Sequence, residues 1–302
     1  MKKVFVIIVT YKGHKWYERC FTSLRNSIYP VQTIVIDNAS NDGTVEYIRE
    51  NFPEIHLIES KENLGFGKAN NLGMRYALDH GCDYVFLLNQ DTWIKEDSIQ
   101  ILLSVAQDNP DYGILSPMHL KADEKSLYIQ IEDGKTDHGN LLLSDCYFST
   151  LKDVYPFTYI NAAAWLISRK TLTTIGGFDP IFFLYAEDDN YLHRLFYHKK
   201  LLGLVPKSQI IHDHQVVNRD YTADFIKYRK RQYLLSTLVD IRKEININNI
   251  LIYYFRKWII SLCTFDVMKS KEVYQDLMFI YKQKKKILKS RTINVKVNQN
   301  WL

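Results

Sequence analysis

Two groups of residues in the sequence have the types and spacing that metal-assisted group transfer requires. The first is Asp91, the last residue of Asn89-Gln90-Asp91, which directly follows the apolar run Tyr84–Leu88. A carboxylate there can hold Mg²⁺ or Mn²⁺, since these ions prefer oxygen ligands and complete their shell with water and substrate phosphates. His212 follows another apolar run, and its imidazole could complete the metal shell. An aspartate that caps the next helix and a surface histidine are the alternatives.

The second group is the acidic sequence Glu187-Asp188-Asp189, which follows an aromatic run at residues 182–186. Carboxylates packed together beside aromatic rings raise one another's proton affinity, which suits a general base. Acidic residues also favour the first turn of a helix because the helix dipole is positive there, so a structural role is the alternative. The aromatic setting favours the base.

The first ninety residues predict a scaffold that brings such side chains together. Apolar runs rich in β-branched residues predict strands at Val4–Thr10, 33–36, 55–58 and Tyr84–Leu88. Helical spacing of apolar residues predicts helices between them at 15–27, Thr44–Asn51 and 67–80. This alternation requires a parallel sheet with right-handed crossovers. Ligands bind such sheets at the carboxyl ends of the strands, so the polar residues directly after each strand are the candidates for binding.

The middle of the chain is less regular. Its pattern predicts strands at 113–118, 159–168 and 202–211 and a helix at 188–198. We expect residues 116–118 and 159–165, with Asn161 and Trp165 prominent, to floor a sugar and acceptor pocket, because aromatic rings stack on the apolar faces of sugars. The alternative is that Trp165 is an ordinary core residue.

A glycine-rich segment at residues 63–73, NLGFGKANNLG, leads a strand end into a helix. It resembles a phosphate-binding turn. It matches neither GxGxxG nor GxxxxGK(S/T), so a dinucleotide site and a P-loop are not favoured.

The composition is that of a folded chain with a large core: 302 residues, 46% hydrophobic and 24% charged. Disorder, collagen-like repeats and a disulfide scaffold are excluded. The four cysteines lie far apart without a CxxC motif, so we expect reduced thiols rather than disulfides or a zinc site. Because the sequence has neither a signal peptide nor an unbroken apolar stretch of about 18–20 residues, we expect a cytoplasmic protein.

The charge distribution changes near residue 220. Residues 1–219 hold 22 Lys/Arg and 27 Asp/Glu, whereas residues 220–302 hold 17 and 7. We therefore expect a catalytic domain at 1–219 and a basic, mainly helical extension at 220–302. Its aromatic residues and its lysine cluster at 282–289 fit a helix in the headgroup region of an anionic membrane, peripheral to the inner face of the plasma membrane. The alternative is a helical pair packed on the catalytic domain or at a dimer interface.

Six ordered motifs over residues 4–214 resemble the family 2 glycosyltransferases of the GT-A fold, and within them the bacterial rhamnosyltransferase-like branch. They are VIIVTYKGHKWYERCFTSL, VIDNASNDGT, NLGFGKANNLG, LLNQDT, IGGFDPIFFLYAED and VPKSQIIHDH. The resemblance implies an α/β protein with a Rossmann-like, mostly parallel central sheet and flanking helices. It also implies a nucleotide-sugar half at about 1–95 and an acceptor half at about 96–219.

The resemblance also assigns roles to nucleotide-binding residues. It implies that Thr10 and Tyr11 border the nucleotide and that Asp37 contacts the nucleobase. It also implies that Gly65 and Asn71 shape the turn beside the nucleotide.

Asn89-Gln90-Asp91 occupies the family's DxD position, where the last carboxylate binds the metal that bridges the diphosphate. Asn89 replaces the first aspartate. An amide can still hydrogen-bond a ribose hydroxyl, but the lost charge is expected to lower metal affinity.

Glu187-Asp188 matches the family's ED pair, with Asp188 as the base, and His212 matches a metal-ligating position. The implied reaction is a metal-dependent single displacement with inversion. The donor is a nucleotide-diphosphate sugar, with dTDP-rhamnose favoured over a UDP-hexose. The acceptor is a hydroxyl of a growing surface polysaccharide or a lipid-linked saccharide.

Two other functions are weighed against this one. A sugar-nucleotide pyrophosphorylase should have a glycine- and basic-rich signature after its first strand, which residues 10–14 match poorly. A non-catalytic protein could bind a sugar nucleotide, or nucleic acid through its basic tail. Retention of the Asp91, Glu187, Asp188 and His212 side chains argues against that reading, and no nucleic-acid partner is expected.

Overall fold

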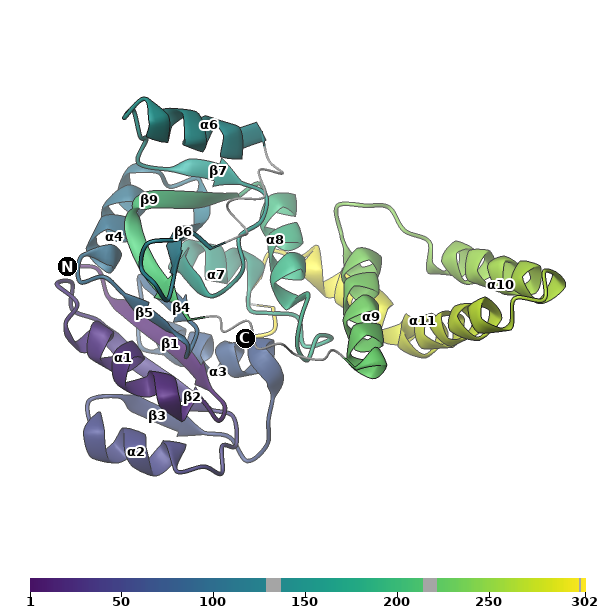
Figure 1. The fold of residues 1–302 in the computed structure, drawn as a ribbon, viewed down its shortest axis with the longest axis horizontal. Coiled ribbons are helices and arrows are strands. Elements are labelled where there is room, and N and C mark those ends of the chain that lie inside the picture. Colours follow the sequence, from purple (N-terminus) through teal and green to yellow (C-terminus); the bar gives the residue numbers. More distant parts are fainter. Residues whose placement is uncertain (129–136, 214–221, 299) are drawn as a thin grey trace.

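The computed structural model describes residues 1–128, 137–213, 222–298 and 300–302, and these fold around a nine-stranded sheet with helices on both faces (Figure 1). Eight strands lie side by side in the order β3 (His56–Glu59), β2 (Gln32–Asp37), β1 (Val4–Thr10), β4 (Tyr84–Leu88), β8 (Ala164–Ser168), β6 (Tyr112–Lys121), β9 (Leu201–His212) and β5 (Thr92–Ile94). The ninth strand, β7 (Tyr155–Phe157), pairs with β9.

The first four strands form the parallel sheet that the sequence predicts. β2 and β4 pair with β1, and β3 pairs with β2, all in parallel. The register pairs Thr10 with Asp37, so β1 and β2 end side by side. The predicted bounds of β1, β4 and α2 (Thr44–Asn51) are confirmed to the residue. The helices α1 (His14–Arg25) and α3 (Gly65–Asp79) begin slightly earlier than predicted.

The second half of the sheet is mixed. β8 pairs antiparallel with β4 and β6, whereas β9 pairs parallel with β6 and antiparallel with β5 and β7. The strand predicted at 159–168 begins only at Ala164. The preceding residues turn instead, because Asn161 Oδ1 accepts a hydrogen bond from Ala163 N–H and the Ile160 carbonyl accepts one from the Trp165 indole.

Two apolar cores cover the two faces of the sheet, since successive side chains of a strand point to opposite faces. Val4, Val6 and Ile8 of β1 pack with residues of α1, α2 and α4 (Ser98–Asp108). Phe5 and Ile7 belong to the other core, which includes residues of α3, α7 (Arg169–Ile175) and α8 (Glu187–Tyr197). α6 (Asp137–Tyr147) lies beside β7 (Figure 1).

The predicted helical extension consists of α9 (Ala223–Val239), α10 (Ile247–Cys263) and α11 (Val267–Asn294). Figure 1 shows that α10 and α11 form a hairpin that projects away from the sheet beyond α9. The predicted boundary near residue 219 lies outside the described residues. Across the described ranges, we find no helix whose length and apolar character would allow it to cross a bilayer.

After the hairpin, the chain returns to the residues that follow α7. The Asn300 carbonyl accepts a hydrogen bond from Gly177 N–H at 2.8 Å. Gly176 has φ +83°, and a Cβ there would be 1.9 Å from the Asn300 carbonyl oxygen. Glycine is therefore required at residue 176 for the end of the chain to dock.

Candidate active site

The carboxyl ends of β1, β2 and β4 border a cleft of about 250 Å³. Five residues singled out in the sequence line it: Tyr11, Gly65, Asn89, Gln90 and Asp91. The remaining lining residues are Val9, Asn38, Asn63, Phe66, Phe183 and Leu184. The cleft therefore lies where a parallel sheet places its ligands.

Gln90 joins the loops that follow β1 and β4. Its Oε1 accepts a hydrogen bond from Tyr11 N–H at 2.8 Å, and its Nε2 donates to the Tyr11 carbonyl at 3.3 Å. Tyr11 itself is 42% exposed. Gln90 thus fixes the backbone that presents an exposed aromatic ring at the cleft, where a base or a sugar could stack.

Thr10 and Asp37 do not line the cleft, but each directly precedes a residue that does. Both are buried, and the Asp37 carboxylate accepts hydrogen bonds from Thr10 Oγ1 at 3.1 Å and from Ser40 N–H at 2.9 Å. The next residue, Asn38, lines the cleft and donates to the Gly65 carbonyl at 3.1 Å. The contact between Asp37 and the nucleobase, which the family resemblance implies, stays a prediction. Asn38 directly follows a strand, as is expected of a residue that binds a ligand.

Asp91 and His212 meet at the edge of the cleft. Oδ1 of Asp91 is 3.3 Å from Nε2 of His212, which is almost fully buried. β5 and β9 bring the two residues together, because Thr92 pairs with His212 and Asp213 N–H donates to the Asp91 carbonyl at 2.9 Å. The Tyr128 ring stacks on the His212 ring at 5.3 Å between centroids. One carboxylate and one imidazole are therefore held within contact distance, as a shared metal site needs.

This pair fits a divalent cation whose other ligands come from substrate and water. Within the part of the chain that the structure describes, no three His, Cys, Asp or Glu side chains group into a complete protein site. Mg²⁺ usually keeps several waters and is held by one or two carboxylates together with substrate phosphates. Asn89 also lines the cleft and offers an amide oxygen without a charge.

Burial turns the acidic segment at the start of α8 into a set of weak acids. Desolvation raises the pKa of Glu187 to about 8, and the neighbouring charge of Asp188 adds to this effect. The same two causes raise the pKa of Asp189 to about 7. Desolvation also raises the pKa of Asp188. The carboxylates of this segment therefore bind a proton more tightly than free carboxylates do, which strengthens them as bases.

Tyr159 holds the Asp188 side chain. Its hydroxyl donates to Asp188 Oδ2 at 2.9 Å, while Asp189 N–H donates to Asp188 Oδ1 at 2.9 Å. Both hydrogen bonds lower the pKa of Asp188, although desolvation by burial has the larger, opposite effect. Tyr159 begins the segment 159–165 that was predicted to floor the pocket, but its hydrogen bond to Asp188 was not predicted.

A short backbone segment lies between the acidic residues and the end of β4. Asn89 N–H donates to the Ala163 carbonyl at 2.9 Å, and the Ala162 backbone hydrogen-bonds Asp188. The half-buried Asn161 belongs to the same segment. Two residues of the turn before α8 line the cleft, although the described carboxylates of α8 do not. The acidic segment and the Asp91–His212 pair are thus both linked to the edge of the sheet where β4 ends.

Two residues expected in the binding site lie in the core instead. Trp165 is fully buried, and its ring packs against Phe178 and Tyr191. Asn71 donates to the Phe178 carbonyl at 2.8 Å and accepts from Phe178 N–H at 2.7 Å. The Asn71 amide also donates to the Trp301 carbonyl, so it ties α3 to two backbone segments rather than shaping the cleft.

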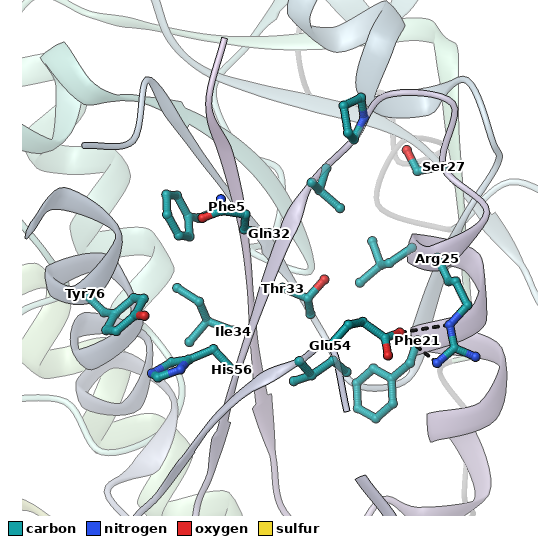
Figure 2. Close-up of a pocket in the computed structure, with 14 residues that line it drawn as sticks. Phe5, Phe21, Arg25, Ser27, Gln32, Thr33, Ile34, Glu54, His56 and Tyr76 are labelled. Atoms are coloured by element: carbon teal, nitrogen blue, oxygen red, sulfur yellow. Dashed lines mark hydrogen bonds and ion pairs between the residues drawn. The ribbon is translucent and has the colours of Figure 1, made fainter. Parts of the chain in front are cut away.

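A larger cavity, of about 600 Å³, lies at the opposite edge of the sheet, where β2 and β3 begin. Figure 2 shows its lining side chains on both sides of the strands, with His56 on one side and Arg25 and Glu54 on the other. Arg25 Nε already donates to Glu54 Oε1 at 2.8 Å. Since parallel sheets bind ligands at the carboxyl ends of their strands, its size alone does not make this cavity the active site.

A sequence comparison decides the family. The sequence model of the family described as Glycosyl transferase family 2 matches residues 5–166, which is more than half of the chain. The chain belongs to this family. The predicted glycosyltransferase class is confirmed, and the pyrophosphorylase and non-catalytic alternatives are not supported.

Curated relatives of this glycosyltransferase include two proteins named for rhamnosyl transfer. The chain is 26% identical over 260 residues to the N-acetylglucosaminyl-diphospho-decaprenol L-rhamnosyltransferase of Mycobacterium tuberculosis, with 76% of this chain and 82% of that protein covered. It is 25% identical to the dTDP-rhamnosyl transferase RfbF of Shigella flexneri, with coverages of 69% and 68%. It is also 25% identical to the low-salt glycan biosynthesis hexosyltransferase Agl10 of Haloferax volcanii, with coverages of 74% and 71%.

Solved structures confirm the GT-A fold of this glycosyltransferase. The Pyrobaculum calidifontis mannosyltransferase PcManGT, in complex with GDP-Man and Mn²⁺, matches with a TM-score of 0.58 at 20% identity. That match covers 80% of this chain and 65% of the mannosyltransferase, so the chain spans about two thirds of its length. S. aureus TarS 1–349 matches with a TM-score of 0.55 at 11% identity, with 93% and 91% covered.

The Tyr159–Asp188 hydrogen bond predicts a shift in the pH dependence of transfer. If Asp188 is the base, kcat/KM rises as Asp188 loses its proton. Tyr159→Phe removes a donor that stabilises the charged carboxylate, so the pKa of Asp188 rises and the acidic limb of the profile moves to higher pH. We expect a loss of about tenfold at pH 6, of the size of a hydrogen bond to a charged group, and a smaller loss at pH 9.

Rates of nucleotide release measured between pH 5 and 9 check this prediction. Tyr197→Phe, at the other end of α8, is the matched control and should keep the wild-type profile. Equal losses of rate by Tyr159→Phe at every pH would contradict it.

Proposed function

We propose that this enzyme transfers a sugar from a nucleotide-diphosphate donor to a hydroxyl of a saccharide acceptor, with inversion and with a divalent metal ion. One observation carries the proposal: the Asp91–His212 pair and the acidic segment that contains Asp188 are both linked to the end of β4. A donor diphosphate in the cleft would lie beside the pair, and an acceptor beside the acidic segment.

Asp91 and His212 are the residues that would hold Mg²⁺ or Mn²⁺. When bound, the ion supplies positive charge that stabilises the departing nucleotide diphosphate. The 3.3 Å separation of their side chains and the exposure of Asp91 to the cleft support this role. The Mn²⁺ in the solved mannosyltransferase complex is consistent with it.

Asp188 would act as the general base. Its carboxylate accepts the proton of the acceptor hydroxyl while the hydroxyl oxygen forms a bond to the anomeric carbon. The bond from that carbon to the phosphate oxygen breaks, and the nucleotide diphosphate leaves on the opposite face. Burial raises the pKa of Asp188 and so strengthens it as a base, and the Tyr159 hydroxyl fixes its orientation.

The names of the relatives support a choice of donor and acceptor. Two relatives are named for rhamnosyl transfer, and one of these names dTDP. The mycobacterial name specifies a saccharide on a diphospho-decaprenol. We therefore propose dTDP-rhamnose as the donor, with a UDP-hexose as the second candidate, and a lipid-linked or surface saccharide as the acceptor.

Asp188→Asn tests the assignment of the base. The amide keeps the shape of the side chain but cannot take the proton, so transfer should fall by about 10³-fold or more. The affinity for free nucleotide should change less than twofold, because Asp188 does not line the cleft. The rate of nucleotide release from dTDP-rhamnose and from UDP-hexoses measures transfer. Calorimetric titration of the free nucleotide measures affinity.

Asp97→Asn, at the start of α4, is the control for the aspartate-to-asparagine change and should be fully active. An Asp188→Asn enzyme with wild-type turnover would refute the base assignment.

We also propose that the α10–α11 hairpin attaches the cytoplasmic enzyme to the anionic inner face of the membrane. Phe265, Val267 and Met268 at the turn of the hairpin are 78–90% exposed. Residues 247–294 hold ten Lys/Arg and three Asp/Glu. Apolar side chains beside an excess of basic ones match an anionic headgroup region, where each basic residue contributes about 1 kcal/mol. A second copy of the hairpin would instead repel this charge.

Substituting the apolar turn tests this attachment. The triple variant Phe265→Ser, Val267→Ser and Met268→Ser should lose about tenfold or more of its affinity for vesicles with 30% phosphatidylglycerol, because the buried apolar area disappears. Flotation of the full-length protein with these vesicles and with pure phosphatidylcholine measures the effect. Full-length protein is required because Phe182 and Ala186 pack with the extension, so removal of the extension would expose a core.

Ile28→Ser, an exposed apolar residue of the catalytic domain, is the control and should bind as wild type. Equal flotation of wild type and the triple variant would contradict the membrane proposal. If light scattering showed a dimeric wild type and a monomeric triple variant that float equally, the hairpin would instead be a dimer interface.

A further inference from the structure

The turn that precedes the acidic segment shares an apolar core with the C-terminal extension. Phe182 and Ala186 are each 1% exposed. They belong to one cluster with residues of the three C-terminal helices, namely Leu235, Leu238, Val239, Ile247, Ile280 and Ile287. Figure 1 shows α9 between α8 and the hairpin. Phe182 and Ala186, which come just before Glu187, are thus packed by the extension.

The backbone of this turn is strained. Tyr185 has φ +70° and Ala186 has φ +67°, so two consecutive residues with a Cβ lie in the left-handed region. That region is unfavourable for residues other than glycine. Such a conformation persists only where the surrounding structure enforces it.

One face of α9 provides this enforcement. The Tyr228 hydroxyl donates to the Leu184 carbonyl at 3.0 Å. The Tyr185 ring lies 5.7 Å from the Phe225 ring, edge to face, and 5.1 Å from the Arg229 guanidinium. Residues 225, 228 and 229 have the spacing of neighbours on one helical face. They contact Leu184, which precedes the strained pair, and Tyr185, which is its first residue.

We propose that α9 is the positioning element of the acidic segment and that Tyr228 is its main positioning residue. The proposal rests on the proposed role of Asp188 as the base. By holding the left-handed pair, α9 sets the direction in which Glu187 and Asp188 leave the turn, and hence the position of Asp188 at the Tyr159 hydroxyl. The extension is then part of the catalytic machinery, in addition to any role at a membrane.

Tyr228→Phe tests the proposal with the smallest possible change, because it keeps the ring and removes the hydrogen bond to Leu184. We expect kcat to fall about tenfold, since small misplacements of a base strongly reduce rate. The KM for the donor and the affinity for free nucleotide should change less than kcat, because nine of the eleven residues that line the cleft lie outside this turn. Tyr281→Phe, on the exposed side of α11, is the matched control and should keep wild-type kinetics.

A second variant distinguishes positioning from general stability. Glycine takes up a positive φ without strain, so Ala186→Gly added to Tyr228→Phe should restore kcat by about threefold or more. A Tyr228→Phe enzyme with wild-type kcat would overturn the proposal. Equal losses of kcat and nucleotide affinity, without rescue by Ala186→Gly, would overturn it too. Failure of the proposed function itself differs from both outcomes, because the wild-type enzyme would then release no nucleotide diphosphate from any sugar donor.

Discussion

The contact between Asp91 and His212 is the interaction on which the account of this glycosyltransferase depends. The two residues are far apart in the sequence, and only the antiparallel pairing of β5 with β9 brings their side chains to 3.3 Å. The parallel pairing of β1, β2 and β4 places the other strand ends at the same edge. A carboxylate and an imidazole at the mouth of a small cleft can share a cation only because both kinds of pairing meet there.

The acidic segment depends on a different constraint, which is desolvation. Glu187 is almost fully buried, and the pKa of about 8 follows from this burial and from the charge of Asp188. A buried carboxyl group of this kind keeps one position only if the neighbouring residues hold it there. Tyr159 holds Asp188 from the sheet side, while the turn before α8 is packed by α9. The acidic segment thus lies where the two parts of the chain, which have opposite net charge in the sequence, pack together.

Much of the fold could be predicted because its signals are local. The apolar runs of β1 and β4 and the helical spacing of α2 gave their exact bounds, and the order of six motifs indicated the family. β8 and β9 were predicted as strands, but their antiparallel pairing and the strand β5 were not. β5 is three residues long and its partner lies more than a hundred residues away. The core positions of Asn71 and Trp165 have the same cause: a polar or aromatic side chain at a plausible position can be used by the core, and burial is a tertiary property. The hydrogen bonds of the Tyr159 and Tyr228 hydroxyls could not be predicted because their partners are set by packing between distant segments.

The most direct test of the central claim is calorimetric titration of dTDP and UDP, with and without Mn²⁺, into wild type and Asp91→Asn. The amide keeps the shape of the carboxylate and removes its charge. If the edge of the sheet binds the diphosphate through a cation, Mn²⁺ should raise wild-type affinity for one of these nucleotides by about tenfold or more, and Asp91→Asn should lose that gain. Asp83→Asn, at the opposite end of β4, should behave as wild type. Equal wild-type affinity with and without Mn²⁺, or the same gain in Asp91→Asn, would contradict the claim.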